Sequence, residues 1–488
     1  MLLWLVIAYL VVSIGIGLYA ATRVHNARDY ITAGRNLPMV VVIAMVFATW
    51  FGAETVLGIS ATFLDEGFRG LISDPLGASV CLILFGLVFA RPLYRMNLLT
   101  LGDFFRVRYN RSTELILSTC IVLSYLGWVA AQITALGLVF NVLSQDAVPM
   151  NQGMLIGAGV VLVYTLFGGM WSVAMTTFVQ MIVIVLGLLY VTFLAGDMAG
   201  GFGTVVGKAA AEGKLSFLPT LDALDMIAWI AAFATMALGS IPQQDVFQRV
   251  NSSKNETIAV WGTTLGGASY FFFAAVPLFL AYTATIIDPA MVSALMEQDS
   301  QLILPTLVLQ YMPFAAQVIF FGALLSVIMS TASGTLLAPS VTFSENVLRG
   351  FLPNMSDSQF LWATRATVVV FTIMVVTYAT STESTIHQMV ENAYRITLAG
   401  AFVPLAAGLF WKRANNLGAA LAIVLGLFTW LMLELFVPEG DVEPQLIGLL
   451  ASAIGMLAGG YLGTPNSEPQ ARPGKSHQAA AMTHHVPH

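Results

Sequence analysis

The chain has 488 residues, of which 58% are hydrophobic and only 9% are charged. A soluble chain of this length would carry roughly 120 charged residues, whereas this one has 20 basic and 26 acidic residues. So few charges cannot solvate a large globular surface or keep a chain disordered, and a net charge of −6 argues against a nucleic-acid binder. The composition predicts an all-α polytopic membrane protein.

A membrane-spanning helix needs about 20 predominantly apolar residues. Thirteen transmembrane helices are expected by this criterion, at residues 2–21, 38–63, 75–95, 113–143, 151–167, 171–196, 224–247, 257–286, 312–348, 360–380, 388–411, 415–436 and 444–463. The transmembrane domain is therefore expected over residues 1–463. The remainder, 464–488, is rich in Pro, Ser, Gln and His and is expected to be a disordered cytoplasmic tail.

Basic residues in the connecting loops predict the orientation of the chain, because they are retained on the cytoplasmic side. With the N-terminus outside, fifteen basic residues fall on the cytoplasmic side and only Arg69, Lys208 and Lys214 fall outside. Acidic residues gather in the outer loops, where Asp74 is expected together with Asp65 and Glu66. The sequence thus predicts a multi-pass protein of the plasma (inner) membrane with its C-terminus in the cytoplasm.

The second predicted span contains an acid near its middle, Glu54, with no basic residue within one helical turn. Gly52 and Gly58 flank this acid, so the helix can unwind there. The seventh span has a matching interruption at Gly239 and Pro242, since proline removes a backbone donor. Two interrupted spans in corresponding positions are typical of a transporter built from inverted repeats. Polar groups at this depth are functional candidates.

Two further features of the predicted spans suit a solute site. Ser330 and Thr331 in the ninth span carry adjacent hydroxyls, and the carbonyl of Val327 lies one turn earlier, so the three can offer oxygen ligands to Na⁺ or serve as helix contacts. Trp50 and Trp128 fall at the midpoints of two spans, where an indole fills the core or faces a cation.

Five motifs, in chain order, resemble those of the sodium:solute symporter family. They are Asp29-Tyr30 with Ala33-Gly34-Arg35-Asn36-Leu37-Pro38, Thr100-Leu101-Gly102-Asp103-Phe104-Phe105, Tyr164-Thr165-Leu166-Phe167-Gly168-Gly169-Met170-Trp171-Ser172-Val173, Pro242-Gln243-Gln244-Asp245-Val246-Phe247-Gln248-Arg249-Val250 and Met329-Ser330-Thr331-Ala332-Ser333. The resemblance implies a LeuT-type fold, with a 5+5 inverted repeat formed by predicted spans two to six and seven to eleven.

The resemblance also implies a sodium site between predicted spans two and nine. Its ligands would be the carbonyls of Ala53, Val56 and Val327 and the hydroxyls of Ser330 and Thr331. Members with a second sodium site use an aspartate and a serine where this chain has Thr177 and Gly334. One Na⁺ is therefore favoured as the cofactor.

Within the family, the chain looks nearest to the choline-transporter branch, which holds its quaternary amine in an aromatic cage. Trp50 and Trp128 match two cage positions, whereas Ala78 and Gln243 stand where a tyrosine and a tryptophan are expected. Glu54 replaces a small residue. It either gives an amine a counter-charge or acts as a carboxylate at the N-terminus of the inner half-helix. These five residues are the predicted substrate-binding set.

The predicted function is a Na⁺-coupled secondary active symporter that imports a small organic solute, such as an amine, a quaternary ammonium compound or another zwitterion. Three alternatives remain open: a proton-coupled carrier that uses Glu54, an amino-acid or carboxylate symporter, and a transporter-like sensor. An enzyme is not expected, because the sequence has no nucleophile–base set, metal motif or nucleotide loop. The expected partners are the solute and the lipid bilayer.

Overall fold

The computed structural model describes residues 1–466 except 220–221, 353, 383 and 439–441. The predicted tail, 464–488, lies almost entirely outside the described residues. Helices of the N-terminal half are α1 (Leu2–Ala21), α2 (Ala27–Thr32), η1 (Ala33–Arg35), α3 (Met39–Trp50), η2 (Glu54–Gly58), α4 (Ile59–Glu66), η3 (Gly67–Leu71), η4 (Ile72–Gly77), α5 (Ala78–Leu84), η5 (Phe85–Phe89), α6 (Ala90–Arg95), α7 (Leu101–Arg108), α8 (Arg111–Leu143), α9 (Met150–Met198) and α10 (Phe202–Ala211). Those that follow are α11 (Ala223–Ala237), α12 (Gln244–Asn251), α13 (Glu256–Phe273), α14 (Ala275–Ile287), α15 (Pro289–Gln298), η6 (Ser300–Leu302), α16 (Ile303–Tyr311), α17 (Phe314–Thr342), η7 (Phe343–Leu348), α18 (Arg349–Phe351), α19 (Asp357–Ala379), α20 (Ile386–Gly400), α21 (Phe402–Phe410), α22 (Asn416–Phe436) and α23 (Pro444–Leu462).

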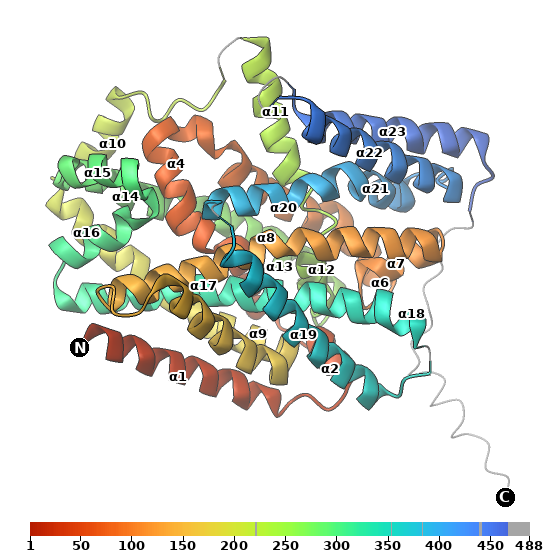
Figure 1. The fold of residues 1–488 in the computed structure, drawn as a ribbon, viewed down its shortest axis with the longest axis horizontal. Helices are drawn as coiled ribbons and strands as arrows, with labels where there is room; N and C mark the ends of the chain where they lie inside the picture. The colour runs from red at the N-terminus through yellow and green to blue at the C-terminus, as the bar shows by residue number, and fades with distance from the viewer. Residues whose placement is uncertain (220–221, 353, 383, 439–441, 467–488) are drawn as a thin grey trace, which may run out of the picture.

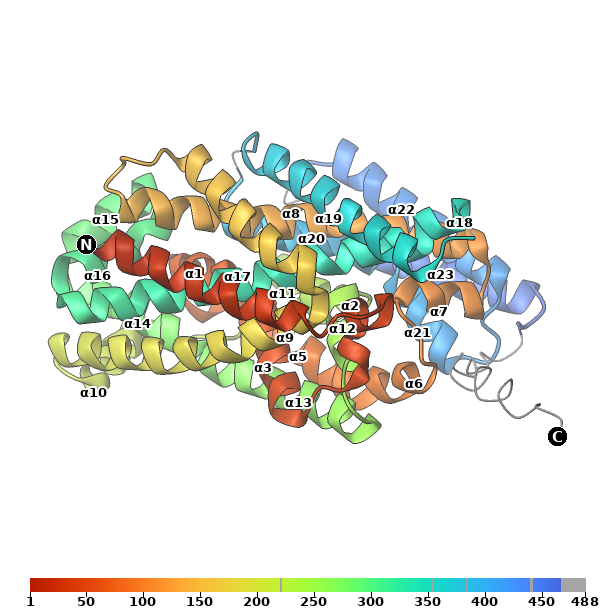
Figure 2. The same cartoon turned by 90° about the horizontal axis from the view of Figure 1, so that it is seen from below.

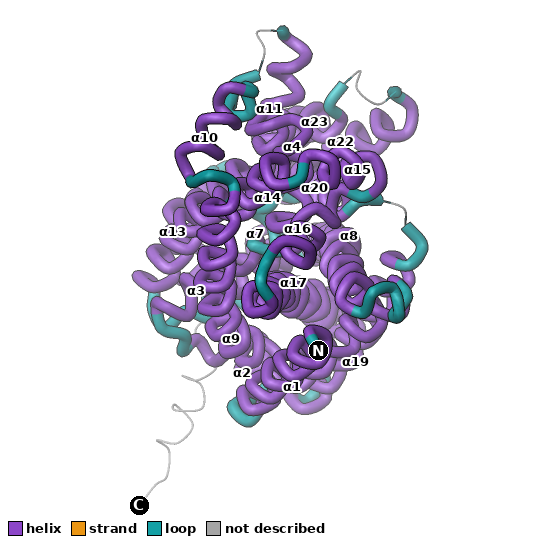
Figure 3. Tube along the Cα trace, turned by 90° about the vertical axis from the view of Figure 1, so that its left-hand side faces the viewer, coloured by secondary structure: helices purple, strands orange, loops and turns teal. Residues whose placement is uncertain are grey.

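The long helices run roughly along one axis of the molecule (Figure 1). Helix α1 lies along the outside of this bundle beside α9 (Figure 2). Seen end-on in Figure 3, most long helices are viewed down their axes. Helix α17 is the most deeply buried of them, with an unbroken buried run from Ala323 to Thr342. The central part of the ninth predicted span, which contains Ser330 and Thr331, is therefore placed in the core.

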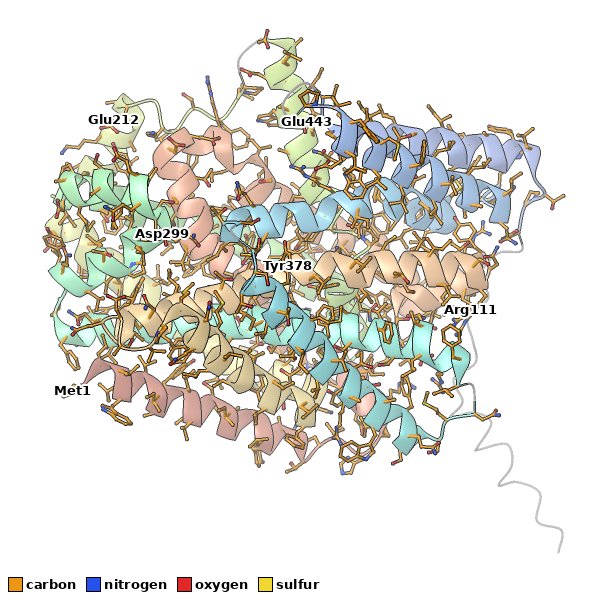
Figure 4. All side chains as sticks on the ribbon, viewed as in Figure 1. Met1, Arg111, Glu212, Asp299, Tyr378 and Glu443 are labelled. Carbon is orange, nitrogen blue, oxygen red and sulfur yellow. The ribbon has the colours of Figure 1, made fainter. Side chains whose placement is uncertain are left out.

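The two ends of the bundle carry different charges. Figure 4 places Glu212 and Asp299 at the end where the chain starts, and Arg111 at the opposite end. Loops rich in acidic residues thus meet at one end, and the loops that follow α6 and α7 meet at the other (Figure 1). This separation agrees with the charge pattern on which the predicted orientation is based.

Both interrupted spans are broken in the structure. Helix α3 ends at Trp50, Phe51 leaves helical geometry with φ −75° and ψ 72°, and the chain becomes helical again at Glu54. Helix α11 ends at Ala237, and α12 begins only at Gln244, after Pro242. Gly52 lies in the first gap, and Gly239 and Pro242 lie in the second. Glycine and proline are the residues from which the sequence predicted both breaks, because they weaken or interrupt a helix.

Nine of the described helices are long and apolar enough to cross a membrane, or ten if α20 and α21 count as one bent span. The chain is thus a multi-pass membrane protein, but this count does not confirm thirteen spans. One reason is that broken spans leave halves too short to count alone, such as α3 and α11. Another is that α9 continues through Gly169, whose φ of 49° and ψ of −133° join two predicted spans at a kink.

Candidate functional site

The broken part of the second predicted span points an acid into the middle of the bundle. Glu54 is 2% exposed. Its Oε1 accepts a hydrogen bond from Trp128 Nε1 at 3.0 Å, and its Oε2 accepts one from Gln132 Nε2 at 2.6 Å. Gln132 in turn accepts from the backbone N–H of Ala53 at 3.0 Å. Helix α8 therefore holds both the carboxylate and the break itself.

Glu54 opens the half-helix that runs on to Glu66. In the predicted orientation this half-helix is the outer half of the span, whereas the inner half-helix was expected. The carboxylate does lie at the N-terminus of a half-helix, as expected, and the helix dipole favours a negative charge there.

Three aromatic rings meet beside Glu54. The ring centroids of Trp50 and Trp128 are 6.3 Å apart, and Tyr394 on α20 lies 6.3 Å from the first and 5.5 Å from the second. All three side chains are almost fully buried. The hydroxyl of Tyr394 and the indole N–H of Trp50 have no hydrogen-bond partner among the described residues. Tyr394 thus adds a third ring to the two that the sequence singled out.

A second acid, Asp74, faces the same region, and its expected place in an outer loop is wrong. Asp74 is 4% exposed and lies within η4, where the chain has turned back into the bundle. Its Oδ1 accepts a hydrogen bond from the hydroxyl of Tyr270 on α13, and that hydroxyl lies 3.0 Å from Thr55 Oγ1. The sequence gave no sign of this burial, because Asp74 directly precedes Pro75 at the edge of an apolar run.

A small, mostly enclosed cavity, the closed cavity, connects the two acids. Its free volume is about 10 Å³, about the space of one water molecule. The lining residues come from four segments and are Glu54, Ser73, Asp74, Thr235, Met236, Val390 and Tyr394. None of these seven is basic, so among the side chains that the structure describes, two carboxylates share the cavity without a cation in its wall.

A larger cavity of about 530 Å³ lies next to the closed one, and Ser73 lines both. Its wall includes Glu66 and Arg69, which are at the end of the molecule that the sequence predicts to face outwards. On α11 the lining residues shift by one turn between the two cavities, from Ala232 to Thr235 and Met236. Only a thin layer of side chains therefore separates the closed cavity from the open one.

The two altered cage positions do not line the closed cavity. Ala78 is fully buried at the start of α5. Gln243 precedes α12, and its Nε2 donates to Ser124 Oγ at 3.1 Å and to Thr397 Oγ1 at 3.5 Å. The amide of Gln243 thus ties the second helix break to α8 and α20.

The structure brings the predicted sodium ligands of α17 against the first helix break. Thr331 Oγ1 lies 3.1 Å from the carbonyl of Ala48 and 3.4 Å from that of Phe51. Ser330 Oγ donates to the carbonyl of Val327 at 2.9 Å. Ala53 and Val56 are fully buried in the adjoining turn. The contact thus joins the two predicted spans, through carbonyls five residues before those of Ala53 and Val56 that the resemblance implies.

A guanidinium fills the space above Gly334, where relatives with a second sodium site have a serine. Arg249 is 1% exposed and pairs with Asp245, four residues earlier on the same helix, at 3.4 Å. A Cβ on Gly334 would lie only 2.0 Å from Arg249 Nη2. A fixed positive charge at this place opposes the binding of a second cation.

We expect Gly334→Ala to destabilise the protein by about 1–3 kcal/mol, because Arg249 is held by Asp245 and cannot move away freely. Thermal unfolding of the purified protein in detergent measures this change. Gly322→Ala is the matched control, since Gly322 lies on the same helix with nothing within 4 Å of its Cβ position. Equal melting temperatures for the two variants would contradict the packing argument.

Three contacts of the site were not found from sequence. Gln132 was recognisable in principle, because it follows Trp128 by one helical turn and so shares its face. Tyr394 and Tyr270 gave no comparable signal, since they reach the site from helices more than a hundred residues away from Glu54.

The sequence matches the model of the Sodium:solute symporter family over residues 30–426, and the chain belongs to this family. It is thus a sodium symporter of the membrane and not an enzyme, as the sequence predicted.

Individual relatives share less than a third of their residues with this chain. The chain is 29% identical to the high affinity choline transporter 1 of Homo sapiens, over 88% of this chain and 75% of that protein. It is 26% identical to the sodium/proline symporter of Haemophilus influenzae, over 85% of each chain. Its fold is similar to that of a Na⁺-coupled sialic acid symporter solved in a substrate-bound outward-open state, with a TM-score of 0.82, 17% sequence identity, and coverage of 96% of this chain and 99% of that one.

Proposed function

We propose that this protein imports a small, positively charged organic solute together with Na⁺. The observation that carries the proposal is the closed cavity at the first helix break, which has Glu54 and Asp74 in its wall and no basic residue among its described lining residues. A buried carboxylate is costly unless a cation or donors compensate its charge. An amine that enters the cavity would supply this compensation, and Trp50, Trp128 and Tyr394 offer aromatic faces close by.

The proposed sodium site would hold the helix breaks in the state that binds solute. Its ligands are the predicted set, with carbonyls of Ala53, Val56 and Val327 and hydroxyls of Ser330 and Thr331. Sodium would link α17 to the end of α3, next to the turn that carries Glu54. Loss of Na⁺ to the cytoplasm would then release this link, so coupling follows from the different affinities of the two states.

The two neighbouring cavities suggest the access route. A solute would enter the larger cavity beside Glu66 and pass the layer at Ser73 and Met236 to reach the acids. Since the inner cavity has room for about one water, side chains of this layer must move apart before a solute binds. The closed cavity would thus correspond to an occluded form in an alternating-access cycle.

The proposed topology has thirteen spans in the plasma (inner) membrane, with the N-terminus outside and the C-terminus in the cytoplasm. Nine long helices become thirteen spans if the kink at Gly169 separates two, if 54–95 contains two, and if each broken pair crosses once. Spans two to six and seven to eleven would then be the inverted repeats. The positions of the two breaks, at the start of each repeat, support this assignment.

We propose one Na⁺ per cycle, because Arg249 fills the place above Gly334. One positive charge moving through 100 mV supplies about 2.3 kcal/mol, and the sodium concentration gradient adds to it. Since each 1.4 kcal/mol is a factor of ten, one ion suffices to concentrate a neutral solute tens-fold. A cationic solute adds its own share of the membrane potential.

Uptake into proteoliposomes tests the coupling. Radiolabelled solutes, including choline, primary amines and proline, are offered with an inward Na⁺ gradient or an inward H⁺ gradient imposed separately. We expect uptake of an amine under the Na⁺ gradient and none under the pH gradient alone. Uptake driven by pH and indifferent to Na⁺ would favour the proton-coupled carrier, and Na⁺-driven uptake of proline alone would favour the amino-acid symporter.

A further inference from the structure

The two acids of the closed cavity differ in what their oxygens already bind. Both oxygens of Glu54 accept from side chains, Oε1 from Trp128 and Oε2 from Gln132. Asp74 uses only Oδ1, which accepts from Tyr270, and its buried Oδ2 has no hydrogen-bond partner among the described residues. The cavity therefore contains one carboxylate oxygen that lacks a donor.

A buried acceptor without a donor is unfavourable, and more so when it is charged. Asp74 is more than nine-tenths buried, lines the cavity, and meets no basic residue among the other lining residues that the structure describes. A ligand with an N–H group on a positive nitrogen would supply both the missing donor and the missing charge. A quaternary ammonium ion supplies the charge but has no N–H.

We infer that the cavity selects organic cations that carry an N–H donor, namely protonated primary, secondary or tertiary amines and guanidinium ions, over quaternary ammonium ions. Asp74 is the residue that makes this selection, by accepting the N–H through Oδ2. Glu54, whose oxygens are held by Trp128 and Gln132, provides charge to both kinds of ligand. This inference rests on the proposed function of a Na⁺-coupled carrier.

A series of four probes isolates the N–H contribution. Ethanolamine, N-methylethanolamine, N,N-dimethylethanolamine and choline share a hydroxyl and a single positive charge, and they offer three, two, one and no ammonium N–H groups. Added methyl groups bury more apolar surface, which by itself favours choline in an aromatic site. Weaker binding of choline would therefore be the opposite of what size and hydrophobicity predict.

Binding of the four probes to the purified full-length protein is measured by thermal shift and isothermal titration in Na⁺ and in K⁺. We expect choline to bind at least about ten-fold more weakly than N,N-dimethylethanolamine in Na⁺, because it leaves Oδ2 unpaired. In Asp74→Asn the ratio is expected to fall to within about two-fold, while Asp146→Asn, in an exposed loop, keeps it.

Choline that binds as tightly as the tertiary amine in the wild type would overturn the inference, and this result needs no variant that might fail to fold. So would an unchanged ratio in Asp74→Asn. Failure of the proposed function has a different signature, which is binding of the probes that is the same in Na⁺ and K⁺. If no amine binds but another solute binds in Na⁺, the inference fails and a Na⁺ symporter of a different solute remains.

Discussion

Replacing Glu54 by glutamine is expected to lower the affinity for a cationic solute about 100-fold, since a buried charge facing the ligand is lost. The variant also creates a conflict, because both carboxylate oxygens now accept from Trp128 and Gln132, and an amide nitrogen cannot accept. Affinity for a cationic and for an uncharged probe is measured in the same Na⁺ buffer. Equal loss of both probes would leave Glu54 with a structural role only.

The contact between Glu54 and Gln132 provides a rescue variant. In Glu54→Gln combined with Gln132→Glu, the side chains exchange roles across the 2.6 Å hydrogen bond, and the new carboxylate can still accept from the N–H of Ala53. We expect this double variant to regain thermal stability and part of the affinity for the cation. Glu297→Gln, on an exposed face of α15, is the control for removing a charge elsewhere.

The second large effect is expected at the proposed sodium site. Changing Ser330 and Thr331 together to alanine removes two oxygen ligands, and we expect the Na⁺ concentration for half-maximal uptake to rise about ten-fold or more, as for the loss of at least 1.4 kcal/mol of binding. Uptake is measured against Na⁺ concentration at a fixed, constant ionic strength. An unchanged Na⁺ dependence would remove these residues from the site.

Thr331 also lies within hydrogen-bond distance of the carbonyl of Ala48, so part of any effect is structural. Melting temperatures in K⁺, where no sodium is bound, measure this part separately. Ser340→Ala is the matched control, because Ser340 is equally buried in α17 and donates only to its own helix, to Leu336. We expect Ser340→Ala to leave the Na⁺ dependence unchanged.

Several elements of this protein were determined by sequence alone. The low charge predicted a multi-pass membrane protein, and the motifs at Arg35, Trp171 and Gln243 predicted the symporter family. Local chemistry also predicted both helix breaks, because glycine and proline at Gly52 and Pro242 interrupt a helix whatever surrounds it.

The composition of the cavity was decided by tertiary structure. Asp74 was expected in an outer loop, since a single acid next to the end of an apolar run normally reaches water. It is buried because η4 turns the chain inwards and because Tyr270, almost two hundred residues later, donates to it. No local pattern encodes this contact, which depends on the packing of α13 against the first helix break.

The aromatic site shows the same division. Trp50 and Trp128 stood out because their depth in apolar segments is a local property, whereas Tyr394 joins them only through the position of α20. Sequence thus determined the membrane class, the family and the two breaks, which depend on near neighbours in the chain. Only the tertiary structure decided which charges and rings face one another, because hydrogen bonds and ring contacts between distant helices are fixed by how those helices pack.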